Sequence, residues 1–475
     1  MEQERVWSRE EIQKAFEEQR KLYAAQPFPP YGERRGWLAE LKTHILKNEN
    51  ACYEALSADF GYRTTFDSFF AEYMPLIEHL KYSIKKLKRW MKPSKRSSGL
   101  ALMPSAVRVH YQPLGVVGVI VPWNFPIYLS LGPVITALAA GNRVMVKLSE
   151  FTPHTNAVIR QILEPLADRV IVIEGEAETA AAFSQLAFDH LLFTGSTRVG
   201  RLVAKAAAEN LTPVTLELGG KSPAIIAPDA KLGIAVDNIL LGKSINSGQI
   251  CVAPDYVLLP KGTENAFVEA YKERFSSHFS KGNQLCDYSH IINELQFKRL
   301  NGYLEDAVAK GANCVEILPE NTNMDEAGRG HVYPPRIITN ASDDMDLMQN
   351  EIFGPILPLV PYDSLEDAVQ FINQRPRPLA LYIMTTKGAT ADYIIKQTHS
   401  GGVCVNDTIM HVAADDAPFG GIGESGMGHY HGFEGFKTFS KAKTVLYSKA
   451  WLPRSRYLLK YRHSMFKLFR KVFLR

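Results

Sequence analysis

Hydrophobic positions along residues 115–200 form short apolar runs, which are separated by longer segments of mixed polarity. The first run, 115–121, is apolar throughout, as expected of a strand buried on both faces of a parallel sheet. The predicted strands are 115–121, 143–147, 170–173 and 190–193. The segments between them predict helices at 127–140, 154–167 and 178–186. This β-α-β-α-β-α-β order predicts a doubly wound parallel sheet.

The same alternation resumes after residue 217 and predicts a second α/β domain. Its first elements are strand 223–226, helix 236–247 and strand 256–260. Residues 109–142 contain no Asp, Glu, Lys or Arg, but four prolines interrupt them. A membrane span needs ~20 continuous apolar residues, so we expect short strands and a helix there instead.

The chain before the first sheet favours helices. Ser8 and Glu11 form a capping box, and the helix that follows ends near Ala25, before the prolines of residues 27–30. Further helices are predicted at 34–47, 51–58 and 67–91. The last of these ends in a basic run, for which we expect a solvated helix face.

Composition narrows the class of protein. Of the 475 residues, 46% are hydrophobic and 22% charged, as in soluble globular proteins. The formal charge is +4, but residues 451–475 hold eight Lys and Arg and no Asp or Glu, so the body is mildly acidic. This argues against nucleic-acid binding by the body. Five cysteines without a C-x-x-C motif suggest neither a metal site nor a disulfide framework, and the polar N-terminus is not a secretory signal. We therefore expect a cytoplasmic protein.

Three motifs carry candidate chemistry. Glu217 stands in L-E-L-G-G-K-S-P, and Cys251 ends N-S-G-Q-I-C one helix later. A thiol with a pKa of about 8.5 needs activation before it can act as a nucleophile. A nearby carboxylate can serve as general base. Asn124, within P-W-N-F-P, can aim its amide at a developing oxyanion, and the structural alternative is an Asx-turn.

A fourth motif, G-S-T-R-V-G, runs from Gly195 to Gly200 and follows a predicted strand. Backbone N–H groups at such a helix start can bind phosphate. The motif is not G-x-G-x-x-G, because Thr197 replaces the middle glycine. It is not a P-loop, because Arg201 stands where a lysine is needed. An ordinary capped helix start is the alternative.

These motifs, in this chain order, resemble the signatures of the aldehyde dehydrogenase superfamily. N-E-I-F-G-P at 350–355 matches the E-x-F-G-P signature, and the likeness continues through 405–407 and 418–426. It covers roughly residues 8–450. A-D-F-G-Y-R at 58–63 is similar to the class 3 enzymes, and within them most to the bacterial coniferyl aldehyde dehydrogenase branch.

The resemblance implies a mechanism. Cys251 attacks the aldehyde carbon, and the side chain of Asn124 with the N–H of Cys251 stabilises the oxyanion. Hydride transfer to a nicotinamide leaves a thioester, and Glu217 activates the water that hydrolyses it. The product is a carboxylic acid. We expect an aromatic, coniferyl-type aldehyde as the substrate, and a medium- or long-chain aliphatic aldehyde is the alternative.

The resemblance also assigns the cofactor. Lys147 and Glu150 would hold the adenosine ribose, and the alternative there is a surface ion pair. The carboxylate of Glu150 would repel a 2′-phosphate, so NAD is expected, with NADP as the alternative. Gly195, Ser196 and Gly200 would bind the pyrophosphate. The nicotinamide end would meet Glu351, Phe353 and Trp123.

The implied architecture is a variant Rossmann domain from residues 1–93 and 113–217 and a catalytic domain from 218–415. Residues 94–112 and 428–450 would form the oligomerisation arms of a homodimer. The tail, 451–475, has an apolar stripe at helical spacing bordered by cations. Such a helix suits an anionic membrane surface, and docking over the substrate entrance is the alternative.

Two rival functions remain. A CoA-acylating aldehyde dehydrogenase or an acyl-phosphate reductase shares the fold, but those lineages commonly lack the general base, and Glu217 is present. A catalytically idle structural homologue is the second rival. The intact set of Asn124, Glu217, Cys251 and Glu351 argues against it.

Overall fold

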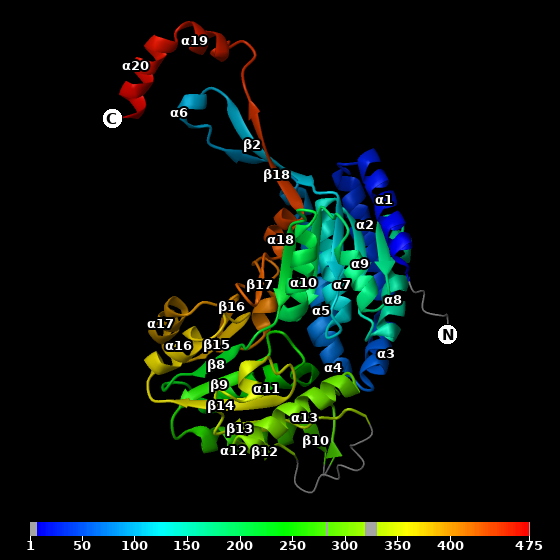
Figure 1. Ribbon diagram of the computed structural model, residues 1–475, viewed down its shortest axis with the longest axis vertical. Coiled ribbons are helices and arrows are strands. Elements are labelled where there is room, and N and C mark those ends of the chain that lie inside the picture. Colours follow the sequence, from blue (N-terminus) through cyan, green and yellow to red (C-terminus); the bar gives the residue numbers. More distant parts are fainter. Residues whose placement is uncertain (1–6, 282–283, 319–329, 475) are drawn as a thin grey trace.

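The computed structural model describes residues 7–281, 284–318 and 330–474. Two α/β lobes form the body, and a long arm leads away from it to the C-terminus (Figure 1). The predicted doubly wound α/β fold is confirmed. The predicted division into domains by function stays a prediction.

The first sheet has the strand order β17-β7-β6-β3-β4-β5. Its strands are β3 (Val116–Ile120), β4 (Arg143–Lys147), β5 (Val170–Ile173), β6 (His190–Gly195), β7 (Val214–Leu218) and β17 (Gly426–Met427). All neighbours are parallel except β17, which is antiparallel to β7. The chain builds outward from β3 to β5 and then returns to place β6 on the other side of β3. Ligands bind at the carboxyl ends of strands at such a reversal.

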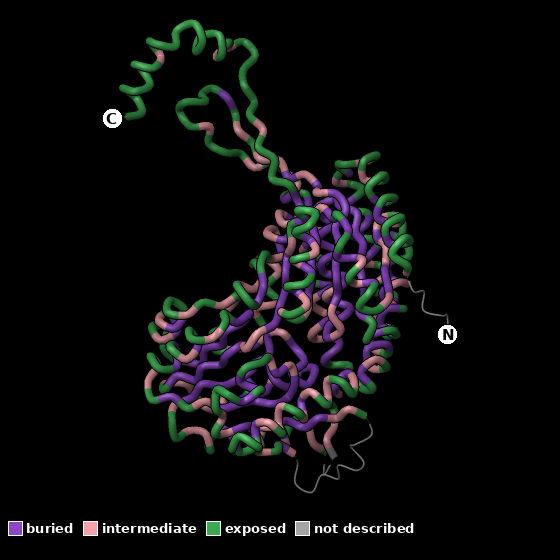
Figure 2. The backbone as a smooth tube through the Cα atoms, in the orientation of Figure 1, coloured by how far each residue is buried: buried purple, intermediate pink, exposed green. Residues whose placement is uncertain are grey.

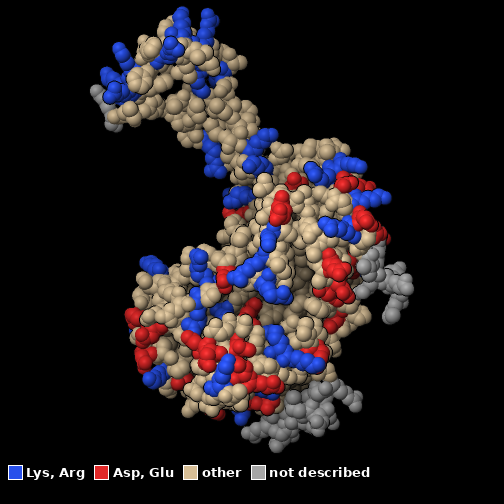
Figure 3. Space-filling model, viewed as in Figure 1, with Lys and Arg blue, Asp and Glu red and all other residues tan. Residues whose placement is uncertain are grey.

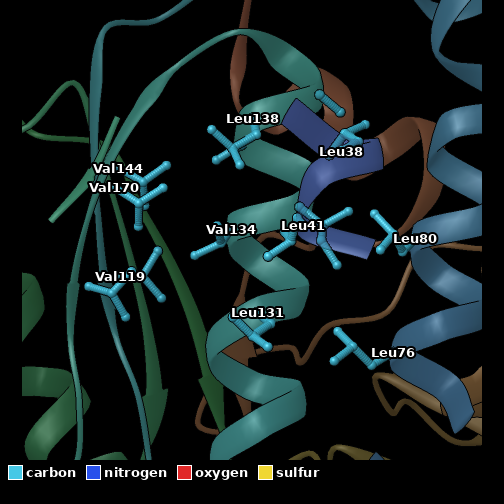
Figure 4. Close-up of a cluster of buried hydrophobic side chains, with 14 of the residues drawn as sticks. Leu38, Leu41, Leu76, Leu80, Val119, Leu131, Val134, Leu138, Val144 and Val170 are labelled. Atoms are coloured by element: carbon cyan, nitrogen blue, oxygen red, sulfur yellow. The ribbon is translucent and has the colours of Figure 1, made fainter. Parts of the chain in front are cut away.

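Helices cover both faces of this sheet. On one face α2 (Tyr31–Lys47), α5 (Met74–Trp90), α7 (Pro126–Ala140) and α8 (Pro153–Leu163) share a large apolar core. Figure 4 shows Leu38, Leu41, Leu76 and Leu80 reaching toward Leu131, Val134 and Leu138 of α7. On the other face lie α1 (Arg9–Ala25), α9 (Ala177–Ser184) and α10 (Thr197–Ala208).

The second sheet has the order β12-β13-β14-β9-β8-β15-β16. Its strands are β8 (Pro223–Ile226), β9 (Tyr256–Pro260), β12 (Asn313–Glu316), β13 (Arg336–Thr339), β14 (Ile356–Tyr362), β15 (Ala380–Met384) and β16 (Gly402–Val405). Only β12 is antiparallel to its neighbour. The helices packed on it are α11 (Leu232–Ser244), α12 (Glu264–Phe279), α13 (Glu294–Ala309), α15 (Asp346–Gln349), α16 (Leu365–Asn373) and α17 (Gly388–Gln397). A short hairpin of β10 (Ser280–Lys281) and β11 (Gln284–Leu285) follows α12.

The arm is a three-stranded antiparallel sheet of β1 (Ser94–Arg96), β2 (Ala106–Pro113) and β18 (Ser440–Tyr447). Short helix α6 (Gly99–Leu102) lies at its tip, and α18 (Gly432–Thr438) precedes β18. The tail forms α19 (Arg454–Lys460) and α20 (Arg462–Phe473) beyond the arm, and its tube is almost entirely exposed (Figure 2). Within the described ranges, no helix is long and apolar enough to span a membrane.

The helices predicted at 67–91 and 236–247 differ from the structure in form or position. Residues 65–90 are helical throughout, but a π-helical turn (Phe69–Tyr73) lies between α4 (Thr65–Ser68) and α5. Pro75, in the first turn of α5, has no N–H to donate to the preceding turn, which explains the wider turn there. The helix at 236–247 is shifted, because α11 begins at Leu232 and ends at Ser244. A tight turn, Ile245–Gly248, follows it, in which Asn246 and Ser247 have positive φ.

Several predicted elements match closely. The strands at 143–147, 170–173, 223–226 and 256–260 have the observed bounds, and the capping box at Ser8 and Glu11 is present. Helix 34–47 begins earlier, at Tyr31, directly after Pro30, because proline is well placed just before a first helical turn. Helix 154–167 ends at Leu163 and tightens into a 3₁₀ turn, Glu164–Leu166.

Candidate active site

The loops that follow β3 and α11 meet between the two lobes. Asn124 lies in the loop after β3, and Cys251 lies in the turn before β9. The Nδ2 of Asn124 donates to the carbonyl of Gln249 at 3.2 Å, and the Nδ2 of Asn246 donates to the carbonyl of Asn124, also at 3.2 Å. The structure therefore brings Asn124 next to the turn that carries Cys251. One of its two amide hydrogens remains for another acceptor.

Glu217, on β7, is 4% exposed, and its carboxylate is wholly buried. Among the described residues, neither of its oxygens has a hydrogen-bond partner. Burial without a partner disfavours the charged form and raises the pKa of Glu217 well above its ordinary value. Once ionised, a carboxylate whose pKa is raised in this way is a stronger base toward water than a solvated one.

Burial of the Cys251 thiol, together with the negative charges of Glu351 and Glu217, raises its pKa to about 12. The backbone N–H groups of Cys251 and Val252 point to the sulfur and act in the opposite direction. The resting nucleophile is thus a thiol, and both carboxylates are close enough to influence it. Donors already directed at this position can stabilise negative charge that forms beside the sulfur.

The carboxylate of Glu351 lies against Gly219. An ideal Cβ at Gly219 would stand 2.1 Å from the Oε2 of Glu351, so only glycine leaves room for this carboxylate. Burial and the charge of Asp255 together raise the pKa of Glu351 to about 8, although the N–H of Gly220, which bonds to the carboxylate, acts in the opposite direction. The L-E-L-G-G-K-S-P and E-x-F-G-P motifs therefore contact each other through the buried carboxylate of Glu351.

Lys221 strengthens this connection. Its Nζ pairs with Asp255 and donates to the carbonyls of Leu347 at 2.6 Å and Asn350 at 3.0 Å. The other oxygen of Asp255 accepts from the N–H of Ile352 at 2.9 Å. These bonds fix the backbone on either side of Glu351.

Trp123 and Phe353 also come together. Their ring centroids are 5.3 Å apart at an angle of 81°. Phe353 has a φ of +49°, an uncommon conformation for a bulky residue, and its carbonyl accepts from Arg299 at 3.3 Å. The two residues form one aromatic corner beside Glu351.

The residues expected to hold the adenosine end lie at the reversal of the first sheet. Lys147, 2% exposed, pairs with Glu150 at 3.1 Å. The pair is not a surface ion pair, because the lysine is buried. Ser196 caps α10 by accepting from the N–H of Val199 at 3.4 Å, so the capped helix start is present. A Cβ at Gly200 would stand 2.5 Å from Leu218, and this glycine lets α10 approach β7 closely.

The donor set fits a dinucleotide. A helix start after β6 offers N–H groups for phosphate, Glu150 offers a half-exposed carboxylate for a ribose hydroxyl, and the Oε1 of Glu351 has no partner among the described residues. The residues bringing these groups together come from β4, α10 and the loop before β14.

Sequence reasoning missed several neighbours of the site. The pKa of Tyr430 is raised well above its ordinary value by burial and by Tyr128, Glu217 and Cys251, which places this aromatic beside both chemical groups. His431 stacks edge-on against Tyr430 with ring centroids 4.6 Å apart. Arg63, at the end of the quoted A-D-F-G-Y-R motif, donates to Asn124. The sequence signal for Arg63 was its place in the A-D-F-G-Y-R motif, to which no chemical role was assigned.

Residues 4–445 match the model of the aldehyde dehydrogenase family. The chain belongs to this family. It is 50% identical over 468 residues to a probable coniferyl aldehyde dehydrogenase of Pseudomonas aeruginosa, covering 98% of this chain and 97% of that protein. It is 38% identical to a rat dimeric NADP-preferring aldehyde dehydrogenase, covering 86% and 88% of the two chains.

The solved structure of substrate-bound Staphylococcus aureus AldH superposes with a TM-score of 0.88 at 34% identity, covering 96% of this chain and 99% of that one. This aldehyde dehydrogenase is therefore an NAD(P)-dependent oxidoreductase that acts on an aldehyde group. The resemblance predicted from the motifs is confirmed. The individual roles of the predicted site residues remain predictions.

Proposed function

We propose that this aldehyde dehydrogenase oxidises an aromatic, coniferyl-type aldehyde to the free acid through a thioester on Cys251. The observation that carries the proposal is Glu217, a buried carboxylate without a partner among the described residues, within electrostatic reach of the thiol. An acyl-transferring enzyme needs no such base, because its thioester is consumed by another nucleophile. Glu217 supports hydrolysis instead.

The proposed reaction has two halves, formation of a thioester and its hydrolysis. The sulfur of Cys251 bonds to the aldehyde carbon, its proton leaves to water, and the carbonyl oxygen becomes an oxyanion held by Asn124 and the N–H of Cys251. Bound NAD(P)⁺ supplies the acceptor for the hydrogen and electron pair of the aldehyde C–H bond. Glu217 then removes a proton from water, hydroxide adds to the thioester, and the S–C bond breaks to release the acid.

The proposed cofactor contacts follow from the same geometry. Glu150 accepts from the adenosine ribose, Lys147 orients Glu150, and the start of α10 at Gly195, Ser196 and Gly200 receives the pyrophosphate. Glu351, Phe353 and Trp123 contact the nicotinamide end. A carboxylate at residue 150 repels a 2′-phosphate, which supports a preference for NAD over NADP.

Two observations support an aromatic substrate. The relative from Pseudomonas aeruginosa carries the name of a probable coniferyl aldehyde dehydrogenase. Tyr430, which lies near the thiol of Cys251, belongs to an aromatic cluster with Tyr128 and His431, and planar rings suit one another at such contacts. A medium- or long-chain aliphatic aldehyde is the alternative substrate.

The test is NAD(P)H formation with coniferaldehyde and with decanal, with product analysis in the presence and absence of CoA. Free acid formed faster from the aromatic aldehyde supports the proposal, whereas acyl-CoA as the product contradicts it. Cys251→Ala should abolish oxidation and leave NAD(P) binding measurable by fluorescence titration, because the thiol enters only the chemistry. Retained turnover in this variant would remove the assigned nucleophile.

We also propose that the arm joins two protomers in a homodimer. Its sheet of β1, β2 and β18 projects from the body, and Leu100 and Met103 at its tip are 65% and 60% exposed. The rat relative is named as dimeric. Light scattering after gel filtration should give twice the mass of the 53.1 kDa chain.

The tail is proposed to hold the enzyme reversibly on an anionic membrane surface. Trp451, Leu459 and Phe466 are 73%, 78% and 64% exposed. The apolar stripe predicted for the tail runs over two helices that are separated at Tyr461: Leu458 lies on α19, and Met465, Phe469 and Val472 lie on α20. Lys and Arg side chains surround these residues, with no acidic side chain on the tail (Figure 3). Each cation near such a surface contributes ~1 kcal/mol.

Co-sedimentation with vesicles of phosphatidylserine and phosphatidylcholine tests this membrane contact. The full chain should bind, less at high salt, and a chain ending at Lys449 should not. A matched variant, Phe466→Ser with Phe469→Ser, keeps every cation and should bind weakly. Equal binding by the full and shortened chains would exclude the tail as the anchor.

A further inference from the structure

The segment from Arg63 to Glu72 passes beneath the loop that carries Asn124. The side chains of Arg63 and Glu72 are 0% exposed and form an ion pair at 3.0 Å between Nη1 and Oε1. The guanidinium lies over the rings of Phe60 and Phe125, at 5.0 Å and 4.8 Å from their centroids. Its plane is therefore fixed from three directions.

Arg63 acts on Asn124 through the backbone. Its Nη1 donates to the carbonyl of Asn124 at 2.8 Å, and the Nδ2 of Asn246 donates to the same oxygen at 3.2 Å. The amide of Asn124 in turn donates to Gln249. The backbone and the side chain of Asn124 are thus held by separate partners, which leaves its amide little freedom to rotate.

Glu72 holds the other end of the same loop. Its Oε2 accepts from the N–H groups of Ile127 at 2.8 Å and Tyr128 at 3.0 Å, in the first turn of α7. A carboxylate at a helix N-terminus is favourable, because it binds N–H groups that lack an intrahelical acceptor. The loop from Asn124 to Tyr128 is therefore secured at both ends by one ion pair.

Asp67 holds the turn before the nucleophile. Its Oδ2 accepts from the N–H of Asn246 at 3.0 Å and from the hydroxyl of Ser289 at 2.5 Å. Asn246 and Ser247 have φ values of +49° and +52°, the left-handed conformation that residues other than glycine rarely adopt. Such a conformation persists only where its surroundings impose it, and the bond from Asp67 is one of those constraints.

We propose that Arg63, Asp67 and Glu72 are positioning residues, which set the amide of Asn124 and the turn leading to Cys251 at the separation that the first chemical step requires. This inference rests on the proposed function. Three buried charges are a poor means of stabilising a fold, because apolar residues of similar size commonly do as well. Placement of reacting groups to within ~1 Å, by contrast, changes rates about 100-fold.

The test compares Arg63→Lys with Arg34→Lys. Arg34 is an equally buried arginine, which donates to the carbonyls of Ala139 and Ala140 at the opposite end of α7. Both variants should lower the midpoint of thermal unfolding by similar amounts. Only Arg63→Lys should slow the pre-steady-state burst of NADH, by 10-fold or more, while the Kd for NAD⁺ stays unchanged.

A second measurement does not depend on turnover. The rate at which iodoacetamide alkylates Cys251, followed against pH by mass spectrometry, reports the local environment of the thiol. Asp67→Asn keeps the size of the side chain and should shift this pH profile, whereas Arg34→Lys should not. Glu72→Gln, which retains an acceptor for Ile127 and Tyr128, should slow the burst less than Arg63→Lys does.

The outcomes separate the two proposals. If wild-type enzyme alkylates normally but forms no NADH from any aldehyde, the proposed function fails, and the alkylation profiles still decide the positioning role. If Arg63→Lys and Asp67→Asn lose burst rate only in proportion to their folded fraction and alkylate like wild type, the three residues are structural and the positioning role is overturned.

Discussion

At the scale of single residues, the site keeps two groups uncharged that both need to act as anions. Glu217 and Cys251 each have a raised pKa, and the charge of one raises the pKa of the other. Because negative charge on Glu217 raises the pKa of Cys251, having both groups ionised at once is disfavoured. This ordering suits a reaction in which the sulfur acts first and the carboxylate acts after the sulfur has become a neutral thioester.

Glu217→Gln separates the two halves of the reaction. The amide is neutral and similar in size, so attack by Cys251 should proceed, but water can no longer lose a proton to residue 217. A burst of NADH near one equivalent per active site should precede a steady state at least 100-fold slower than that of wild type. Rapid-quench or stopped-flow absorbance measures both phases. Loss of the burst itself would show that Glu217 acts earlier.

Gly219→Ala tests the close packing of the Glu351 carboxylate against Gly219. The new Cβ would stand 2.1 Å from a carboxylate oxygen, so Glu351 must leave the N–H of Gly220. The Kd for NAD(P)⁺ should rise several-fold, as fluorescence titration would show. Gly302→Ala is the matched control, because a Cβ there meets nothing within 4 Å on helix α13. An unchanged Kd for Gly219→Ala would mean that Glu351 does not contact the cofactor.

At the scale of elements, local pattern was a good guide wherever burial decided the structure. Strands β4, β5, β8 and β9 were predicted at their observed bounds because apolar runs buried on both faces have few alternatives. The end of α11 was misplaced for the opposite reason. Its turn depends on Asp67, which is distant in sequence, and no local pattern reports such a bond.

The same limit applies to the candidate site. Asn124, Glu217, Cys251 and Glu351 were found through a resemblance of motifs, whereas periodicity and composition pointed to none of them. The contact between the Glu351 carboxylate and Gly219 links positions far apart in the chain. So do the hydrogen bonds that Arg63 and Glu72 make. Their geometry emerges only when both sheets are in place.

Removal of the tail distinguishes its two interpretations at this scale. The tail bonds to the arm through Arg454, which donates to the carbonyl of Leu102 at 2.6 Å. A chain ending at Lys449 should therefore oxidise a water-soluble aromatic aldehyde with unchanged kcat/KM. A fall in kcat/KM of more than about threefold in steady-state assays would indicate that the tail covers the substrate entrance. Loss of a single methylene-sized contact with the substrate already lowers kcat/KM about 10-fold or more.

At the scale of the whole molecule, buried histidines limit stability in acid. Burial lowers the pKa of His190 to about 4, of His411 to about 4 and of His431 to about 3. Above pH 6.5 such a residue is neutral in both states and contributes nothing. Below it the unfolded chain binds a proton that the folded chain excludes, so the free energy of unfolding falls by ~1.4 kcal/mol per pH unit for each residue until its folded pKa is reached.

His190→Gln tests this dependence away from the site. His190 bonds to the hydroxyl of Thr215 at 2.9 Å, and a glutamine can keep a polar contact there without titrating. Between pH 6.5 and 4 the midpoint of thermal unfolding should fall less steeply for the variant than for wild type, and the slopes should agree above pH 7. Scanning calorimetry at pH 7, 6 and 5 measures them. Parallel curves throughout would show that His190 has the same pKa in the folded and unfolded protein.

The bonds of Arg63, Asp67 and Glu72 also restrict how the molecule moves. Asp67 belongs to the helical layer on the first sheet, and its partners Asn246 and Ser289 belong to the lobe of the second. A hinge between the lobes would have to break these buried, charge-assisted bonds, which are costly to leave unmade. The enzyme therefore does not exchange its ligands by opening a hinge between the two lobes. We therefore expect ligands to enter and leave while the two lobes stay packed against each other.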